Sequence, residues 1–274
     1  MAKLVESRPR GRPKAFHDTT DQNTVQSLDR AMILLDLMSH SAGLTLSDMA
    51  QQTGQAAATV YRALITLQAH GMVEVEEKGQ LWHVGGGAFR VGSAFLRRTK
   101  VVERARAPMD ALMRATGETA NLGIESGDEV LFLSQVETHE AIRAFFPPGT
   151  KGPMHVSGIG KALLAWYPAD RVQGIIARQG LPKFTSLSIT SETSLLRDLA
   201  HTRARGYSID DQERASGMRC IAAPIFNAFG EAIAGLSVSG PAFRINLSDA
   251  SQIGHAVRQA ADSVTQATGG EIPT

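Results

Sequence analysis

The sequence predicts an α+β protein in two parts, a small helical domain followed by a larger domain built on an antiparallel sheet. Apolar residues recur at helical spacing over 27–71 and alternate as in a strand hairpin over 72–84. Further on, the period changes: strand-like runs at 120–145 and 208–239 enclose the predicted helices 157–166, 168–179 and 190–205, and a last helix follows at 247–268. Strands, then helices, then strands again are typical of an α+β domain with a mainly antiparallel sheet.

Length and composition limit the classes of protein that remain. The 274 residues suffice for two domains, and no run of about 18 apolar residues would cross a membrane. The polar, basic start lacks the apolar core of a signal peptide, and the single cysteine, Cys220, fits a reducing cytoplasm. The eight histidines show no C-x-x-C or H-x-x-x-H spacing, so we expect neither a metal site nor a cofactor.

The stretch 45–71 predicts two short helices joined by a tight turn. Thr45 with Asp48 three residues later is an N-cap pattern, Gly54 ends the first helix, and Gly71 ends the second. A hairpin with its turn at Lys78-Gly79 follows. Two helices, a tight turn and a hairpin are the order of a winged helix-turn-helix, whose second helix enters the DNA major groove. An ordinary helical hairpin is the alternative for this stretch taken alone.

A preceding helix over 27–39 would complete the domain. Ser27 is its expected N-cap, and we expect Leu28, Met32, Leu35 and Met38 to cover the other two helices. On the second of those, Thr59, Tyr61 and Arg62 lie on the face opposite the apolar one. The predicted DNA contacts are Arg8, Arg10, Arg12, Ser47, Thr59, Tyr61, Arg62 and Lys78.

Positive charge flanks the predicted DNA-reading domain rather than lying within it. Residues 1–14 hold five basic side chains against one acid, and residues 86–106 hold six against one. Residues 24–85, in contrast, hold three basic and six acidic side chains. Because neutralised phosphates supply most DNA affinity, we expect the flanks to provide much of it.

The first flank is an arm, residues 1–22, with almost nothing apolar to bury, so it is expected to be disordered. Its core, RPRGRPK over 8–14, resembles an AT-hook that lies in the minor groove of A·T-rich DNA, and a solvated basic tail is the alternative. The domain at 23–85 ends at a glycine run, 85–87, that we expect to be a flexible break.

The second flank, 86–106, is predicted to be a linker helix. It could track phosphates or lie on a membrane surface, but Phe89, Phe95 and Leu96 need cover, which favours packing against a second subunit. Pro108 is expected to open the next helix, within a domain spanning 107–270. Strands are predicted at 120–124, 130–136, 141–145, 208–210, 220–226 and 232–239.

Several stretches resemble one family, the IclR family of bacterial transcriptional regulators. They occur in the family's order and read VQSLDRAMILLDLM, TLSDMAQQTG, TVYRALITLQAHGMV, MHVSGIGKALLA, RARGYSIDDQERASGMRCIAAPIF and LSVSGP. The resemblance implies a winged helix-turn-helix, a linker helix that mediates dimers, and a GAF-like effector domain that binds a small carboxylic acid. It also implies homodimers that pair into homotetramers, in a bacterial cytoplasm and associated with the nucleoid.

The family's effector contacts are carried over by motif to Gly158, Ile159, Asp210, Met218, Cys220, Ser237 and Ser239. Ser237 and Ser239 are two apart on a predicted strand, so both hydroxyls point to one face and could donate to a small acid. Met218 and Cys220 would share a face in the same way. No arginine in these motifs is an obvious clamp, so backbone N–H groups and hydroxyls are expected to hold the anion. The alternatives are a surface strand, a turn at Asp210 and a merely buried cysteine.

Within the family, the chain is most similar to members that sense glyoxylate or pyruvate, and to a regulator of a β-hydroxyaspartate gene cluster for glyoxylate assimilation. The expected function is therefore binding of double-stranded DNA under the control of a small 2-oxo acid, first of all glyoxylate. The sequence departs from the family's pattern at the start of the recognition helix. Where members commonly have a Pro-Lys-Ser-Thr-like run, this chain has Ala56-Ala57-Ala58-Thr59.

Two other functions compete with this one. An enzyme would use Cys220 or Ser237 as nucleophile, but neither a G-x-S-x-G elbow nor a complete phosphate loop is present. An architectural DNA-binding protein would respond to no small acid.

Overall fold

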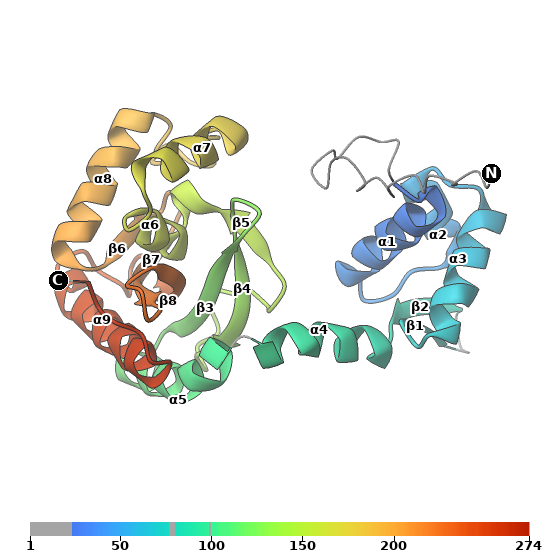
Figure 1. Cartoon of the computed structure of the whole chain (residues 1–274), viewed down its shortest axis with the longest axis horizontal. Helices are drawn as coiled ribbons and strands as arrows, with labels where there is room; N and C mark the ends of the chain where they lie inside the picture. Colours follow the sequence, from blue (N-terminus) through green and yellow to red (C-terminus); the bar gives the residue numbers. More distant parts are fainter. Residues whose placement is uncertain (1–23, 77–79, 99, 274) are drawn as a thin grey trace, which may run out of the picture. The chain divides into compact units, whose positions relative to one another are not determined.

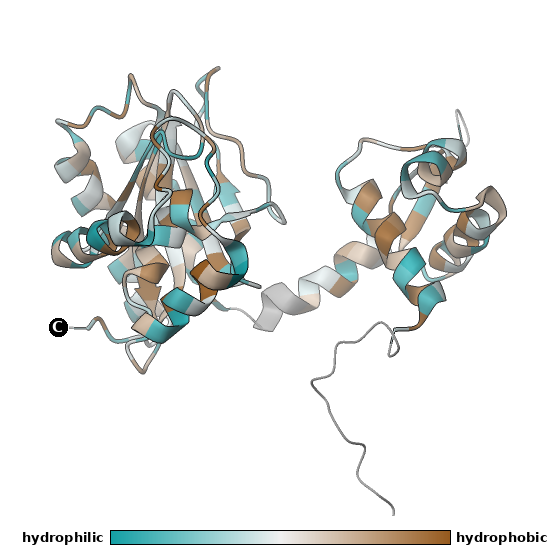
Figure 2. Cartoon of the chain, turned by 90° about the horizontal axis from the view of Figure 1, so that it is seen from above, coloured by the Kyte–Doolittle hydropathy of each residue, from teal (hydrophilic) through white to brown (hydrophobic). Residues whose placement is uncertain are grey.

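The computed structural model describes residues 24–76, 80–98 and 100–273, which form two compact units divided between Arg97 and Arg98 (Figure 1). Hydrophobic and hydrophilic residues alternate around the helices of both units (Figure 2), as expected for helices that each bury one face. The predicted α+β class, with a winged helix-turn-helix ahead of an antiparallel-sheet domain, is confirmed.

The N-terminal unit surrounds a small core with three helices and a hairpin. In chain order its elements are α1 (Gln26–Ser39), α2 (Leu46–Thr53), α3 (Ala57–Ala69), β1 (Val73–Glu76), β2 (Leu81–Val84) and α4 (Gly86–Arg98). Leu34, Met49, Val60 and Leu64 are completely buried at the centre of this core. Leu44 forms an isolated bridge with Trp82 of β2, which attaches the hairpin to the segment before α2.

The ends of α2 are as predicted. The Thr45 hydroxyl accepts the N–H of Asp48 at 3.2 Å, and the Asp48 carboxylate accepts the N–H of Thr45 at the same distance. This reciprocal capping box satisfies two of the backbone donors that a helix start leaves free. Gly54 then takes the left-handed conformation, with φ at 66°.

One expectation for α1 is wrong and another is right only in part. The helix begins at Gln26, so Val25 rather than Ser27 is its N-cap residue, and the cap has no side-chain hydrogen bond. A helix start that forms no side-chain cap gives little sign of its position. Of the face expected to cover α2 and α3, Met38 is buried and Leu35 packs against the core, but Leu28 and Met32 are 60% and 55% exposed.

The glycines at 85–87 are not a flexible break. The N–H of Gly87 donates to the carbonyl of Gly71 at 2.7 Å, and the N–H of Gly85 donates to the carbonyl of Met72 at 2.8 Å. A Cβ on Gly85 would come within 2.6 Å of the Gly71 carbonyl oxygen, and one on Gly87 within 2.5 Å. Glycine is required here because two backbone segments touch, and α4 begins within the run.

The C-terminal unit is a six-stranded antiparallel sheet with helices on both faces. It contains α5 (Lys100–Thr116), β3 (Thr119–Ser126), β4 (Glu129–Val136), β5 (Lys151–Pro153), the 3₁₀ helix η2 (Met154–Val156), α6 (Gly158–Leu164), α7 (Ala169–Gln179), α8 (Glu192–Arg205), β6 (Ser208–Asp211), β7 (Met218–Phe226), β8 (Ala232–Pro241) and α9 (Ala250–Ala267). The strand order is β5-β4-β3-β8-β7-β6. The helices α5 and α9 pack together on one face, while α6 packs on β7 and β8 from the other (Figure 1).

Two further expectations fail in this unit. Pro108 lies inside α5 rather than at a helix start, and its neighbours Ala105 and Met109 are fully buried. Their burial outweighs the backbone hydrogen bond that a proline removes. The segment 141–145 is not a strand, because the edge beside β4 is occupied by β5, which the sequence pattern did not indicate. Prolines 147 and 148, without N–H donors, follow that segment directly.

Candidate ligand cavity and nucleic-acid interface

A cavity of about 70 Å³ lies between α6 and the sheet of the C-terminal unit. At about 10–15 Å³ for each water-sized group, it holds roughly five such groups. Its lining includes six of the seven residues predicted for the effector site: Gly158, Ile159, Asp210, Cys220, Ser237 and Ser239. Met218 is not in the lining, and it pairs with Pro241 at the beginning of β7.

The register of three strands brings the polar lining residues side by side. Cys220 of β7 pairs with Ser239 of β8 on one side and with Asp210 of β6 on the other. Ser237, two residues before Ser239, shares its face because side chains alternate along a strand. A carboxyl, a thiol and two hydroxyls therefore face one small space, although they lie up to 29 positions apart in the sequence.

The two hydroxyls differ in their partners. Ser239 Oγ accepts a hydrogen bond from Asn121 Nδ2 at 3.4 Å, and Asn121 Oδ1 accepts one from Gln135 Nε2 at 3.0 Å. Ser237 Oγ is completely buried and has no nitrogen or oxygen partner among the described residues, and it faces only the weakly hydrogen-bonding thiol of Cys220. A buried hydroxyl without a partner costs about 1–3 kcal/mol, so a donor or acceptor brought into the cavity would relieve that cost.

The first turn of α6 forms another wall of the cavity. Ser157 caps it, with its hydroxyl accepting the N–H of Gly160 at 3.3 Å. A Cβ on Gly158 would lie 2.6 Å from Cys220 Sγ, so only glycine lets α6 approach the sheet this closely. Burial, with the nearby charge of Asp210, raises the pKa of the Cys220 thiol to about 11, so the thiol is neutral at pH 7.

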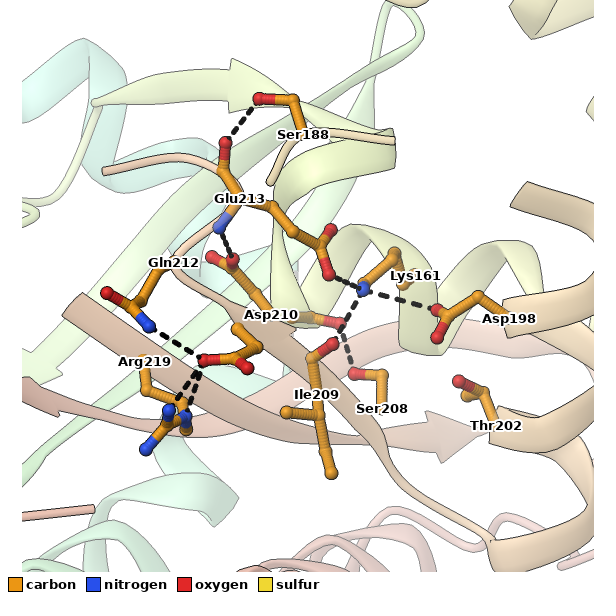
Figure 3. A network of polar contacts seen from close by, with 12 residues as sticks. Lys161, Ser188, Asp198, Thr202, Ser208, Ile209, Asp210, Gln212, Glu213 and Arg219 are labelled. Atoms are coloured by element: carbon orange, nitrogen blue, oxygen red, sulfur yellow. Dashed lines mark hydrogen bonds and ion pairs between the residues drawn. The ribbon is translucent and has the colours of Figure 1, made fainter. Parts of the chain in front are cut away.

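A buried ion network lies next to the cavity (Figure 3). Lys161 of α6 is fully buried, with its Nζ 2.5 Å from Glu213 Oε1 and 3.2 Å from Asp198 Oδ2 of α8. Burial raises the pKa of Asp210 to about 6 and that of Glu213 to about 7, against the opposing effect of Lys161. Sequence reasoning missed this network, although Lys161 stands inside the family-like motif SGIGKALL.

Two basic residues also line the cavity and were not predicted. Arg214 follows Glu213 in the loop after β6, and its Cζ lies 4.3 Å from the centre of the Phe184 ring. Lys151 of β5 is the second, and its Nζ lies 3.8 Å from Glu129 Oε2. No arginine in the motifs was an obvious clamp from the sequence, and the structure adds Arg214 to the lining of the cavity. No local pattern marks Arg214, because its place depends on how the loop after β6 folds back.

In the N-terminal unit, the predicted base-reading residues lie on α3 but on two faces. Thr59 and Arg62 border a hollow between α1 and α3. Tyr61 is 53% exposed on the adjacent face, close to the exposed Ile65. The N-cap residue of this helix is Ala56, which provides no side-chain cap, as the run of alanines predicts.

The other predicted DNA contacts are only partly within the described residues. Ser47 is exposed in the first turn of α2. The arm with Arg8, Arg10 and Arg12 lies outside them, as does Lys78 in the hairpin turn. Of the linker residues expected at a subunit contact, Phe89 is 76% exposed, and the side chains of Phe95 and Leu96 also lie outside the described set.

Metal sites and membrane-spanning helices can both be sought in the part of the chain that the structure describes. No three histidine, cysteine, aspartate or glutamate side chains gather there in a way that would hold a metal ion. No helix in these ranges combines the length and the apolar character that crossing a membrane requires.

A winged helix-turn-helix unit followed by a sheet domain with a small ligand-sized cavity is the architecture of a DNA-binding transcriptional regulator. Comparison with known families agrees with this class. Residues 27–77 match the IclR helix-turn-helix domain, and residues 93–266 match the bacterial transcriptional regulator IclR C-terminal domain. The chain belongs to the IclR family of transcriptional regulators.

Individual relatives match over nearly the whole chain. The HTH-type transcriptional regulator BhcR of Paracoccus denitrificans is 51% identical over 260 residues, which are 94% of this chain and 93% of that protein. The transcriptional repressor IclR of Escherichia coli is 40% identical over 95% of this chain and 96% of its own. Among solved structures, the Thermotoga maritima IclR superimposes with a TM-score of 0.76 at 25% identity, covering 89% and 99% of the two chains.

Proposed function

We propose that the C-terminal cavity binds a small 2-oxo carboxylic acid, glyoxylate first and pyruvate second, and that the bound acid changes the affinity of the N-terminal unit for its operator. The observation that carries this proposal is the buried Ser237 hydroxyl, which lines the cavity and has no nitrogen or oxygen partner among the described residues. A ligand oxygen would provide that partner, and the donors beside it favour an anion.

The size and composition of the cavity support an acid of this class. Room for roughly five water-sized groups suits two to four carbons with their oxygens. Ser239 and the backbone N–H groups of Gly158 and Ile159 offer further donors, and Phe132 and Phe146 close the cavity with an apolar wall. Polar groups in an otherwise apolar pocket fix the orientation of a ligand. Glyoxylate is favoured by the likeness to glyoxylate-sensing members of the family.

DNA recognition, in this proposal, is shared between the recognition helix and its basic flanks. Thr59, Tyr61 and Arg62 with Ser47 and Lys78 choose the site, while Arg8, Arg10 and Arg12 of the arm at 1–22 and the basic linker at 86–106 supply attraction to phosphates. A homodimer, or a homotetramer formed by two dimers, presents two such units to two half-sites. The domain limits 23–85 and 107–270 then separate DNA reading from effector binding.

The test combines DNA binding with effector titration. An operator is first selected from a random duplex library with the purified full chain, and its affinity is then measured by fluorescence anisotropy at fixed salt. We expect glyoxylate or pyruvate to change the affinity at least threefold. The double variant Ser237→Ala, Ser239→Ala should lose this response, whereas Ser251→Ala, an exposed serine on α9, should keep it.

Three results would contradict the proposal. If every two- to four-carbon oxo and hydroxy acid leaves the affinity unchanged, the protein binds DNA without this control. If the double serine variant responds like the unmodified chain, the acid binds elsewhere. Consumption of the acid by the purified protein would support an enzyme instead.

A further inference from the structure

The ammonium group of Lys161 links three elements beside the cavity. It donates to the carbonyl of Ile209 on β6 at 2.6 Å and to Glu213 Oε1 at 2.5 Å, and it lies 3.2 Å from Asp198 Oδ2 of α8 (Figure 3). Lys161 lies three residues after Gly158, which lines the cavity. Its position therefore couples the wall formed by α6 to the loop that follows β6.

Glu213 connects Lys161 to Asp210, which lines the cavity. Its backbone N–H donates to Asp210 Oδ1 at 2.8 Å, and its carbonyl accepts the Ser188 hydroxyl at 2.7 Å (Figure 3). The side chain, N–H and carbonyl of one residue thus hold Lys161, Asp210 and Ser188 in place. Asp210 is itself 7% exposed and lines the cavity with Ser237.

The charges around Asp210 do not balance when an anion enters. The titratable and charged groups near it are Lys161 on α6, Cys220 on β7, Asp211, Glu213 and Arg214 in and after β6, with Asp198 on α8 and His155 on η2 behind Lys161. Asp211 is paired with Arg219, Arg214 stacks on Phe184, and burial lowers the pKa of His155, which favours its neutral form. Lys161 is already matched by two carboxylates. A ligand carboxylate next to an ionised Asp210 would bring two negative charges together in a small, mostly apolar cavity, whose lining cations, Arg214 and Lys151, are held at Phe184 and Glu129.

We propose that the cavity takes up one proton together with its acid, on the carboxyl group of Asp210, and that Lys161, acting through Glu213, sets the pH range in which this occurs. This inference rests on the proposed function. The protonated carboxyl donates its O–H to the ligand carboxylate, while its other oxygen keeps the N–H of Glu213. No covalent bond forms or breaks apart from the transfer of this proton from solvent. The raised pKa values of Asp210 and Glu213 place the range near neutrality.

Calorimetric titration of the full chain with sodium glyoxylate and sodium pyruvate tests this proposal. Each titration is repeated in two buffers with different ionisation enthalpies, since the difference in heat counts the protons taken up. We expect almost none at pH 5, where Asp210 is already protonated, and close to one per ligand at pH 8. Kd should be flat below about pH 6 and should rise towards tenfold per pH unit above it.

Variants separate this proposal from a merely structural role. Asp210→Asn places a permanently neutral group at this position, so we expect a Kd that does not change with pH and heats that do not depend on buffer. Glu213→Gln still offers an acceptor to Lys161 but removes the carboxylate that is repelled by an ionised Asp210, so the rise in Kd should begin at lower pH. Asp262→Asn, on α9 across the sheet, should keep the wild-type profile. Melting curves identify any variant that has not folded.

The outcomes distinguish this inference from the function on which it rests. Clear binding with heats that do not depend on buffer at pH 8 would overturn the proton uptake and leave the acid effector intact. A pH dependence that survives in Asp210→Asn would overturn the assignment to Asp210, and a Glu213→Gln profile identical to that of the wild type would overturn the role of Lys161 and Glu213. Failure of both acids to bind at any pH would instead contradict the proposed function.

Discussion

Replacing Ser237 with alanine should stabilise the C-terminal unit, although serine-to-alanine changes in a buried sheet are usually costly. The Ser237 hydroxyl is completely buried without a nitrogen or oxygen partner among the described residues, so its removal relieves a penalty of about 1–3 kcal/mol. The matched control is Ser208→Ala. Ser208 is equally buried, and its hydroxyl donates to the carbonyl of Gly158 at 2.6 Å and to that of Ala222 at 3.3 Å. Both serines flank Ala222 in one row across three strands.

The two variants should therefore change stability in opposite directions. We expect a gain of about 1 kcal/mol for Ser237→Ala and a loss of about 1–2 kcal/mol for Ser208→Ala, or roughly 2–4 °C in Tm per kcal/mol. Urea unfolding in a Trp82→Phe background measures this, because the other tryptophan, Trp166, then reports on the C-terminal unit alone. Equal losses in both variants would refute the reasoning, since they would mean that the Ser237 hydroxyl is already satisfied in the free protein.

Three other predictions concern the remaining features. Ala56→Asp should stabilise α3 by about 0.5–2 kcal/mol, because that helix starts without a side-chain cap, and the gain is measured as a rise in the Tm of the N-terminal unit. Asp210 and Glu213 have folded-state pKa values above their unfolded ones, so their contribution is fully present below about pH 4 and is lost as pH rises through 6 to 7. The stability of the C-terminal unit should fall over that interval, and Glu213→Gln should make the fall smaller. Deleting residues 1–14 should weaken DNA binding and reduce the log–log slope of affinity against salt by about 0.9 for each phosphate that the arm neutralises, and an unchanged slope would mean that the arm touches no phosphate.

Features set by neighbouring residues could be predicted from the sequence. The capping box of Thr45 and Asp48 and the left-handed Gly54 depend on a few adjacent positions. The common face of Ser237 and Ser239 follows from the period of a strand. The identity of their partners in the cavity came from resemblance to a family rather than from spacing, and the structure places all but Met218 around one space.

Features set by distant residues could not be predicted in this way. Glu213 lies 52 positions from Lys161, and nothing in the local pattern of either indicates the pair. The strand expected at 141–145 has the right composition, but β5 occupies the sheet edge instead. Glycines 85–87 suggested flexibility because their composition does not show what lies against them. In each case the deciding factor is a tertiary contact that overrides local preference.

The close contact between Gly71 and the glycines before α4 has a mechanical consequence. Gly71 follows the C-cap residue of α3, His70, and Gly87 lies in the first turn of α4, so the two helices meet through their main chains. Side-chain contacts can adjust by changing rotamers, but a joint made of peptide groups cannot. A rotation of α4 therefore rotates the recognition helix, α3, by a similar amount. A residue larger than glycine at position 87 would push the two backbone segments apart. Such a variant would keep its separate binding sites but lose the coupling between them.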